Sequence, residues 1–155
     1  MRRSKRWTNR SGTDDEGSAS LEFITAGMVL LLPLVYLVLT MSTIQAGAFA
    51  VEGAARQAAR VYVQSPNVAH ANAAASRAVE FALADYGFDT DAVTVSVSCR
   101  PSPSQCLQRR GFVTVVVTTT VALPLVPPVL DLDVPLSVPI SSTATQQVSR
   151  FWGSR

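Results

Sequence analysis

Hydrophobic residues dominate the first third of the chain and predict its first helix. Residues 23–44 are mostly Leu, Val, Met and Ile, and no charged residue occurs between Glu22 and Glu52. At about 1.5 Å per residue, a helix of this length spans the roughly 30 Å hydrocarbon core of a bilayer. A buried core helix is the alternative, but such helices are usually shorter, and the rest of the chain is too small to surround this one. The pattern therefore predicts one transmembrane helix.

Small residues continue the helical pattern beyond the apolar stretch. Ala46, Ala50, Ala54 and Ala58 recur every four residues and so lie along one side of a helix over residues 45–64. Stripes of this kind allow a second helix to approach closely, including within a membrane. Packing on the chain's own outer domain accounts for the stripe equally well. The helix is therefore expected to continue to residue 64, with the partner of its small-residue side left open.

A second helix is predicted directly after a turn. Residues 68–86 are rich in Ala and place apolar residues near helical spacing. The turn at residues 65–67 precedes them, and Gly87 follows as a residue that commonly ends helices. His70, the chain's single histidine, lies in this stretch without Cys or carboxylate neighbours at ligand spacing. We therefore interpret it as a surface residue.

The last third of the chain has the period of β-strands. The β-prone runs are residues 93–99, 112–123, 132–140 and 142–148. The first two predict a hairpin with a long loop, and the last two offer a third strand that Pro135 and Pro139 confine to a sheet edge. The Pro-rich residues 123–130 are expected to form a loop that covers the sheet, or to contact the membrane surface or a partner.

These elements together predict an α+β fold. It consists of a single N-terminal transmembrane helix that continues into an extracytoplasmic helix, a second Ala-rich helix, and a small antiparallel β-sheet of three to four strands.

Charge is concentrated before the apolar stretch. The net charge is +2, and residues 1–17 carry five basic and three acidic groups, so the rest of the chain is neutral in sum. Basic residues that precede a membrane span place that end in the cytoplasm, and the C-terminal domain is then extracytoplasmic. A nucleic-acid-binding protein would be expected to carry a net basic folded region. The neutral remainder therefore predicts no nucleic-acid partner.

A secretory signal peptide also combines a basic start with an apolar middle. Cleavage near Ala48 or Ala50 would fit the small-residue pattern of signal peptidase sites. The apolar run is longer than the roughly 7–15 residues of a signal-peptide core, and acidic residues separate it from the basic tail. A secreted protein cleaved near Ala48 stays open as an alternative.

Two short strings resemble a known family. Residues 17–23 read GSASLEF, with a Gly at the edge of the apolar run and Glu22 five residues later. Residues 52–60 read EGAARQAAR where the helix leaves the membrane. Together they resemble the TadE-like minor pseudopilins, type IV pilin-like proteins of tight-adherence (Flp-type) pilus systems. The resemblance is dense over residues 17–60 and thin beyond.

The resemblance implies a processing and assembly role. A prepilin peptidase would cut after Gly17 and leave Ser18 as the new N-terminus, and Glu22 and Phe23 would act in assembly. The implied division is a cleaved basic leader of residues 1–17, a transmembrane helix with its outer extension over 18–64, and an extracytoplasmic α+β domain over 65–155. The implied partners are membrane lipid, the prepilin peptidase, other pilin-like subunits and pilus assembly proteins. Whether the protein enters the filament or only primes it is left open.

The two cysteines lie in the loop of the predicted hairpin. Six residues separate Cys99 from Cys106. An extracytoplasmic location permits a disulfide between them. A zinc site would need more ligands than two thiols and one distant histidine.

No sequence motif indicates catalysis. Ser and Thr are abundant, but none stands in a nucleophile motif, and neither paired carboxylates nor a Gly-rich phosphate loop occurs. We therefore expect no enzyme activity, no cofactor, no metal and no small-molecule substrate. A structural pseudopilin is the leading hypothesis, and a membrane-anchored extracellular binding module outside any filament is the alternative from another class.

Overall fold

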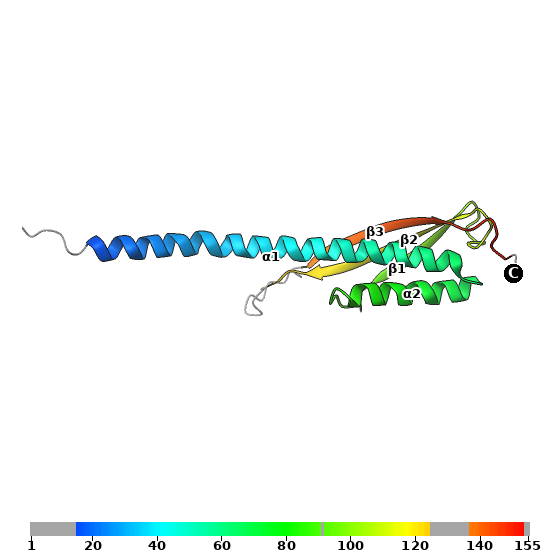
Figure 1. The fold of residues 1–155 in the computed structure, drawn as a ribbon, viewed down its shortest axis with the longest axis horizontal. Coiled ribbons are helices and arrows are strands. Elements are labelled where there is room, and N and C mark those ends of the chain that lie inside the picture. Colours follow the sequence, from blue (N-terminus) through cyan, green and yellow to red (C-terminus); the bar gives the residue numbers. More distant parts are fainter. Residues whose placement is uncertain (1–14, 91, 125–136, 154–155) are drawn as a thin grey trace, which may run out of the picture. The chain divides into compact units, whose positions relative to one another are not determined.

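The chain folds into two helices and three strands in the computed structural model. The structure describes residues 15–90, 92–124 and 137–153. In chain order the elements are α1 (Asp15–Gln64), α2 (Val68–Ala84), β1 (Thr94–Arg100), β2 (Phe112–Ala122) and β3 (Ser137–Gln147) (Figure 1). The chain divides into two compact units, Met1–Val38 and Leu39–Arg155, and the boundary falls inside α1. The α+β prediction is confirmed.

Helix α1 begins at Asp15 and continues through Pro33 to Gln64. Its end is set by the sequence that follows. Ser65 donates its hydroxyl to the carbonyl of Val61 at 2.8 Å, and its amide donates to the carbonyl of Tyr62 at 3.2 Å. Pro66 has no amide to continue the helix. The turn predicted at residues 65–67 is therefore present.

Helix α2 begins with a side-chain cap and buries one narrow stripe. The Asn67 side chain accepts a hydrogen bond from the amide of His70 at 2.8 Å, which satisfies one of the free amides of the first turn. The buried residues recur every four positions, as Ala71, Ala75, Val79 and Leu83. Gly87 follows with a φ of 73°, the left-handed conformation that glycine adopts readily. The predicted helix ends two residues later than the observed one.

The three strands form one antiparallel sheet in the order β1-β2-β3. Thr94 to Arg100 pair with Thr118 to Phe112, and Phe112 to Ala122 pair with Gln147 to Ser137. The hairpin prediction is confirmed. The third strand runs without a break from Ser137 to Gln147 and so joins parts of both predicted pieces, and Pro139 lies on an edge strand as expected. Pro135 and most of the Pro-rich segment lie outside the described residues.

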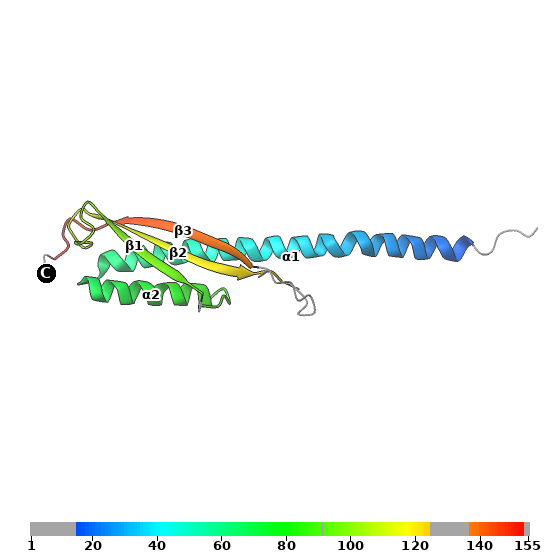
Figure 2. The same cartoon turned by 180° about the vertical axis from the view of Figure 1, so that it is seen from behind.

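The core of the second unit lies between the helices and one face of the sheet. Figure 2 shows the sheet in front of α1, with α2 beside it. Alternate residues of β2 are buried, as the period of two requires: Val113, Val115, Val117, Thr119 and Val121. They share a core with small residues of α1 and the buried stripe of α2. Ala and Val dominate this core, so the two layers pack closely.

Tyr62 is the largest fully buried side chain of this core. It is 1% exposed, and burial raises the pKa of its phenol above the usual value because the charged form would lose its hydration. The phenol therefore stays neutral at physiological pH.

Thr119 gives a first test of the packing. It is 1% exposed, and its hydroxyl has no hydrogen-bond partner among the described residues. It lies one residue beyond Thr118, the last position of β2 that pairs with β1. Thr119→Val keeps the shape and removes the unpaired hydroxyl, so we expect the free energy of unfolding to rise by about 1 kcal/mol. Thermal unfolding of the full chain in detergent measures the change.

Thr114→Val is the matched control. The Thr114 hydroxyl contacts that of Thr145 at 2.9 Å, so its removal is expected to leave stability unchanged or slightly lower. A loss of stability in Thr119→Val would contradict an unpaired hydroxyl and indicate a buried water as its partner.

Candidate functional site

The first unit presents an apolar helical surface. Large side chains from Leu21 to Val38 are exposed in this part of α1, and Phe23 is 80% exposed. Within the described residues, α1 is the one helix long and apolar enough to cross a membrane. Apolar surface of this extent is far larger than the patches that soluble monomers usually expose. The helix therefore fits a lipid environment or contact with other helices.

Polar side chains on this surface are satisfied within the helix. The hydroxyl of Thr25 donates to the carbonyl of Leu21 at 2.7 Å, and that of Thr43 donates to the carbonyl of Leu39 at 3.0 Å. Internal hydrogen bonds of this kind lower the cost of placing a hydroxyl in hydrocarbon. These residues are therefore compatible with a membrane.

Glu22 is the one charged residue next to this apolar surface. It is exposed on α1, and the following charge along the chain is Glu52. A charged side chain at the centre of a bilayer costs about 2.5–3.5 kcal/mol on translocon-insertion scales. Glu22 therefore needs either a place among the lipid headgroups or a cationic partner.

The predicted processing residues lie at the start of α1. Gly17 and Ser18 are within the helix that begins at Asp15, and nothing is described of their side chains. Residues 1–14 of the predicted leader lie outside the described residues. Processing after Gly17 stays a prediction.

The small-residue stripe packs inside the second unit. Ala50, Ala54 and Ala58 are each 0% exposed and belong to the core, while Ala46 is partly exposed. A Cβ added at Gly47 would lie 2.6 Å from a methyl carbon of Val121. Small residues therefore let the sheet approach α1 closely. Of the two partners that the sequence left open for this stripe, the structure shows packing on the chain's own outer domain. Glu52 and Arg56, on the exposed side, form an ion pair worth only about 0.3–0.5 kcal/mol.

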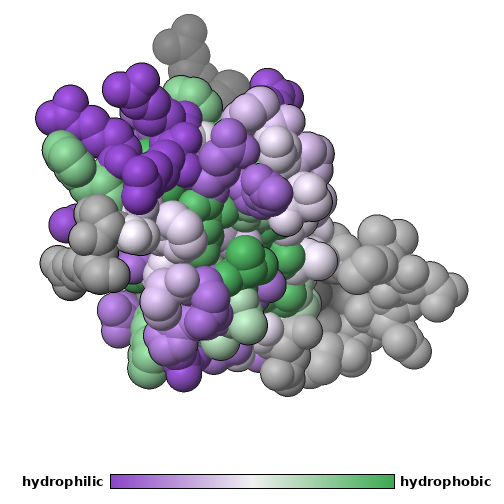
Figure 3. Space-filling view, turned by 90° about the vertical axis from the view of Figure 1, so that its right-hand side faces the viewer, coloured by the Kyte–Doolittle hydropathy of each residue, from purple (hydrophilic) through white to green (hydrophobic). Residues whose placement is uncertain are grey.

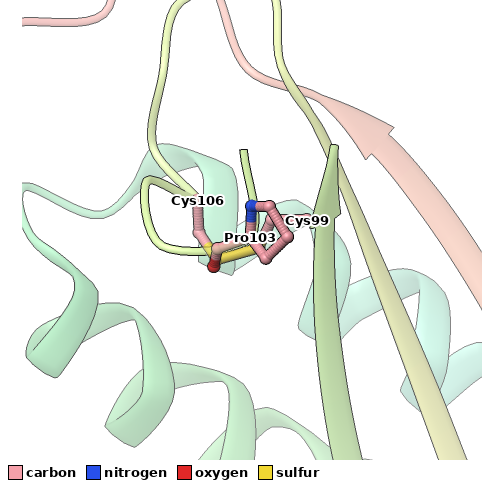
Figure 4. The surroundings of a disulfide bond; sticks show 3 residues. All are labelled: Cys99, Pro103 and Cys106. Carbon is pink, nitrogen blue, oxygen red and sulfur yellow. A yellow bond between two sulfur atoms is a disulfide. The ribbon is translucent and has the colours of Figure 1, made fainter. Parts of the chain in front are cut away.

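The two cysteines form a disulfide, as the sequence permitted. Cys99 and Cys106 are bonded with their Cα atoms 5.0 Å apart (Figure 4). The bond joins the end of β1 to the β1–β2 loop, and Cys99 is 5% exposed. It fixes the loop beside the buried Leu107.

Removal of this bond is expected to destabilise the domain. In the chain-entropy model, a closed loop of this length contributes about 2–3 kcal/mol. Cys99→Ala with Cys106→Ala should lower the free energy of unfolding by roughly 2 kcal/mol, measured by thermal unfolding of the full chain in detergent. An unchanged transition temperature would contradict a structural role for the bond.

Metal-binding side chains do not cluster in the described part of the chain. His, Cys, Asp and Glu side chains there do not gather in groups of three that suit a metal ion. His70 is exposed on α2, as expected of a surface residue.

One feature of the second unit was not predicted from the sequence. At the end of the unit where α1 finishes, four arginines lie on segments that meet: Arg100, Arg109, Arg110 and Arg150. A cavity of about 480 Å³ opens there beside Arg109, Leu107 and Trp152. The net-charge argument missed this cluster because it summed charges over the domain. In the sequence, the basic residues near the ends of the predicted strands were the signal that could have indicated this cluster.

Comparison with protein-family models, with curated proteins and with solved structures finds no match for this chain.

Proposed function

We propose that the protein is a structural or assembly pseudopilin of a tight-adherence type pilus or a related secretion filament. It is anchored in the cytoplasmic membrane with its N-terminus in the cytoplasm and its α+β domain outside. A prepilin peptidase removes the leader after Gly17. The resemblance of residues 17–23 and 52–60 to TadE-like proteins supports this proposal.

One structural observation carries the proposal furthest. The exposed apolar part of α1 has a single carboxylate, Glu22, at its edge, and the same helix continues into the core of a small α+β domain. An element of this kind serves both as a membrane anchor before assembly and as a helix that packs among its neighbours afterwards. A membrane-anchored binding module would also need the anchor, but it would not need a helix that packs among neighbouring subunits.

Glu22 has a defined role in this proposal. Cleavage after Gly17 would leave the amine of Ser18 four residues from Glu22, about one helical turn. The carboxylate would pair with this amine of a neighbouring subunit and set the register of the helices. Such a pair removes the cost of an isolated carboxylate beside hydrocarbon.

Glu22→Gln tests this role because it keeps the shape and removes the charge. We expect normal leader removal but at least about ten-fold fewer filaments, since a hydrogen bond to a charged group contributes about 1.5–3 kcal/mol. Filaments are counted by electron microscopy of cells that express the variant at the wild-type level.

Glu52→Gln is the matched control, because it makes the same change at an exposed carboxylate paired with Arg56. We expect wild-type filament numbers from it. Normal filaments with Glu22→Gln would refute the assembly role of Glu22.

A further inference from the structure

Four arginines of the second unit, Arg100, Arg109, Arg110 and Arg150, lie on segments that meet at one end of the unit, which we call the basic end. Their positions follow from hydrogen bonds and strand pairing between separate segments. The amide of Arg110 donates to the carbonyl of Val148 at 3.1 Å, and Nε of Arg109 donates to the carbonyl of Trp152 at 2.9 Å. Arg100 pairs with Phe112, which itself pairs with Gln147 at the end of β3. The loop, the end of β1 and the segment after β3 therefore meet here.

Charge at the basic end has a single sign. The segments that build it, residues 98–112 and 145–153, contain these four arginines and no Asp or Glu. Figure 3 looks onto this end and shows strongly hydrophilic residues gathered on one side of it. Charges of one sign held this close create a local positive potential.

The acidic residues of α2 lie at its other end. Glu80 and Asp85 are near the C-terminal end of α2, whereas the basic end adjoins its N-terminal end. The 17 residues of α2 separate the two ends by about 25 Å, which is more than two Debye lengths at physiological salt. Among the described residues, charge of opposite sign therefore lies at the two ends of α2.

Aromatic side chains accompany the arginines. Phe112 is 47% exposed and Phe151 is 64% exposed, and the guanidinium of Arg150 lies 4.6 Å from the centre of the Phe151 ring. Trp152 lines the cavity of about 480 Å³ together with Val68 and Leu107. Exposed rings offer flat faces on which bases stack, and guanidinium groups bind phosphate with two parallel hydrogen bonds.

We propose that the basic end binds single-stranded nucleic acid. The arginines contact successive phosphates, and Phe112 and Phe151 stack on bases. This assignment differs from the expectation of no nucleic-acid partner, which rested on the summed charge and stays untested. The aromatic faces favour nucleic acid over a polyphosphate, which has no flat group to stack on them.

Binding is measured with the full chain in neutral detergent micelles and a short fluorescent oligothymidine, by fluorescence anisotropy at several salt concentrations. Each phosphate contact in a single strand contributes about −0.7 to the slope of log K against log salt, so three or four contacts give about −2 to −3. Arg100→Gln with Arg150→Gln should make the slope less steep by about 1.4. The basic residues of the leader are common to all variants, so a difference in slope between variants reports on the basic end alone.

Arg77→Gln is the control for an arginine outside the basic end, because Arg77 is exposed on α2 among the residues of a separate groove. It should leave both the affinity and the slope unchanged. An unchanged slope in the double variant would overturn the proposal.

A second variant separates stacking from charge. Phe151→Ser should weaken oligothymidine binding by about five-fold or more and leave the binding of inorganic polyphosphate unchanged. Equal weakening of both polymers, or polyuronate and polyphosphate binding as tight as that of oligothymidine, would overturn the assignment to nucleic acid and indicate a general polyanion site.

Discussion

Gly47→Leu is expected to unfold the second unit at physiological temperature. Gly47 is buried in α1, and even a Cβ there would lie 2.6 Å from Val121 and 3.1 Å from a methyl carbon of Ile140. Val121 is itself buried, at 1% exposed. Overpacking of a dense core costs about 1–3 kcal/mol for small additions, and four added carbons should cost more than about 3 kcal/mol. Trp152 fluorescence during thermal unfolding measures the loss.

Two further variants make this prediction specific. Gly53→Leu makes the same change at an exposed helical position with nothing within 4 Å of the added Cβ, so stability should not fall. It should rise slightly, because leucine is the better helix former. Adding Val121→Ala to Gly47→Leu should recover part of the loss. A Gly47→Leu protein as stable as the wild type would contradict the close packing of α1 on the sheet.

Gly17→Leu is expected to abolish removal of the leader. In the proposed function the peptidase recognises a residue without a side chain at the cut site, and leucine would fill that position. The variant should stay in the membrane fraction at its full length, seventeen residues longer than the processed protein. Gel mobility and intact mass distinguish the two forms.

Gly27→Leu is the control for this experiment. Gly27 lies in the apolar part of α1 with nothing within 4 Å of an added Cβ, so the substitution should leave processing intact. Normal processing of Gly17→Leu would refute the cleavage site. If the leader is removed from neither variant, any added side-chain volume in α1 blocks insertion into the membrane.

Local patterns were enough to predict the elements of this fold. The alternation of residues 93–99 and 112–123 predicted the hairpin because one face of the sheet is buried and the other is not. The third strand appeared as two pieces because Ser, Thr and Pro139 weaken its β-propensity, and pairing along the whole of β2 joins the pieces.

Contacts between distant residues were not predictable in the same way. The small-residue stripe had two equally good partners, and only the approach of Val121 to Gly47 decides in favour of the domain's own sheet. The basic end depends on the register that brings Arg100, Phe112 and Gln147 together. Composition contains no information about such pairings, so a neutral sum concealed a charged surface. The sequence alone likewise does not distinguish Thr119 from its neighbours in the strand. The structure does, because the pairing of β2 with β1 ends at Thr118.

The most direct test of the account is the N-terminus of the protein in the membrane fraction. Intact-mass measurement with N-terminal sequencing should find a start at Ser18, which the proposed pseudopilin requires. A start at Met1 would contradict the proposal and support an unprocessed, anchored binding module. A start near Phe49 or Val51 would also contradict it, because the chain would then be a secreted protein cut by signal peptidase.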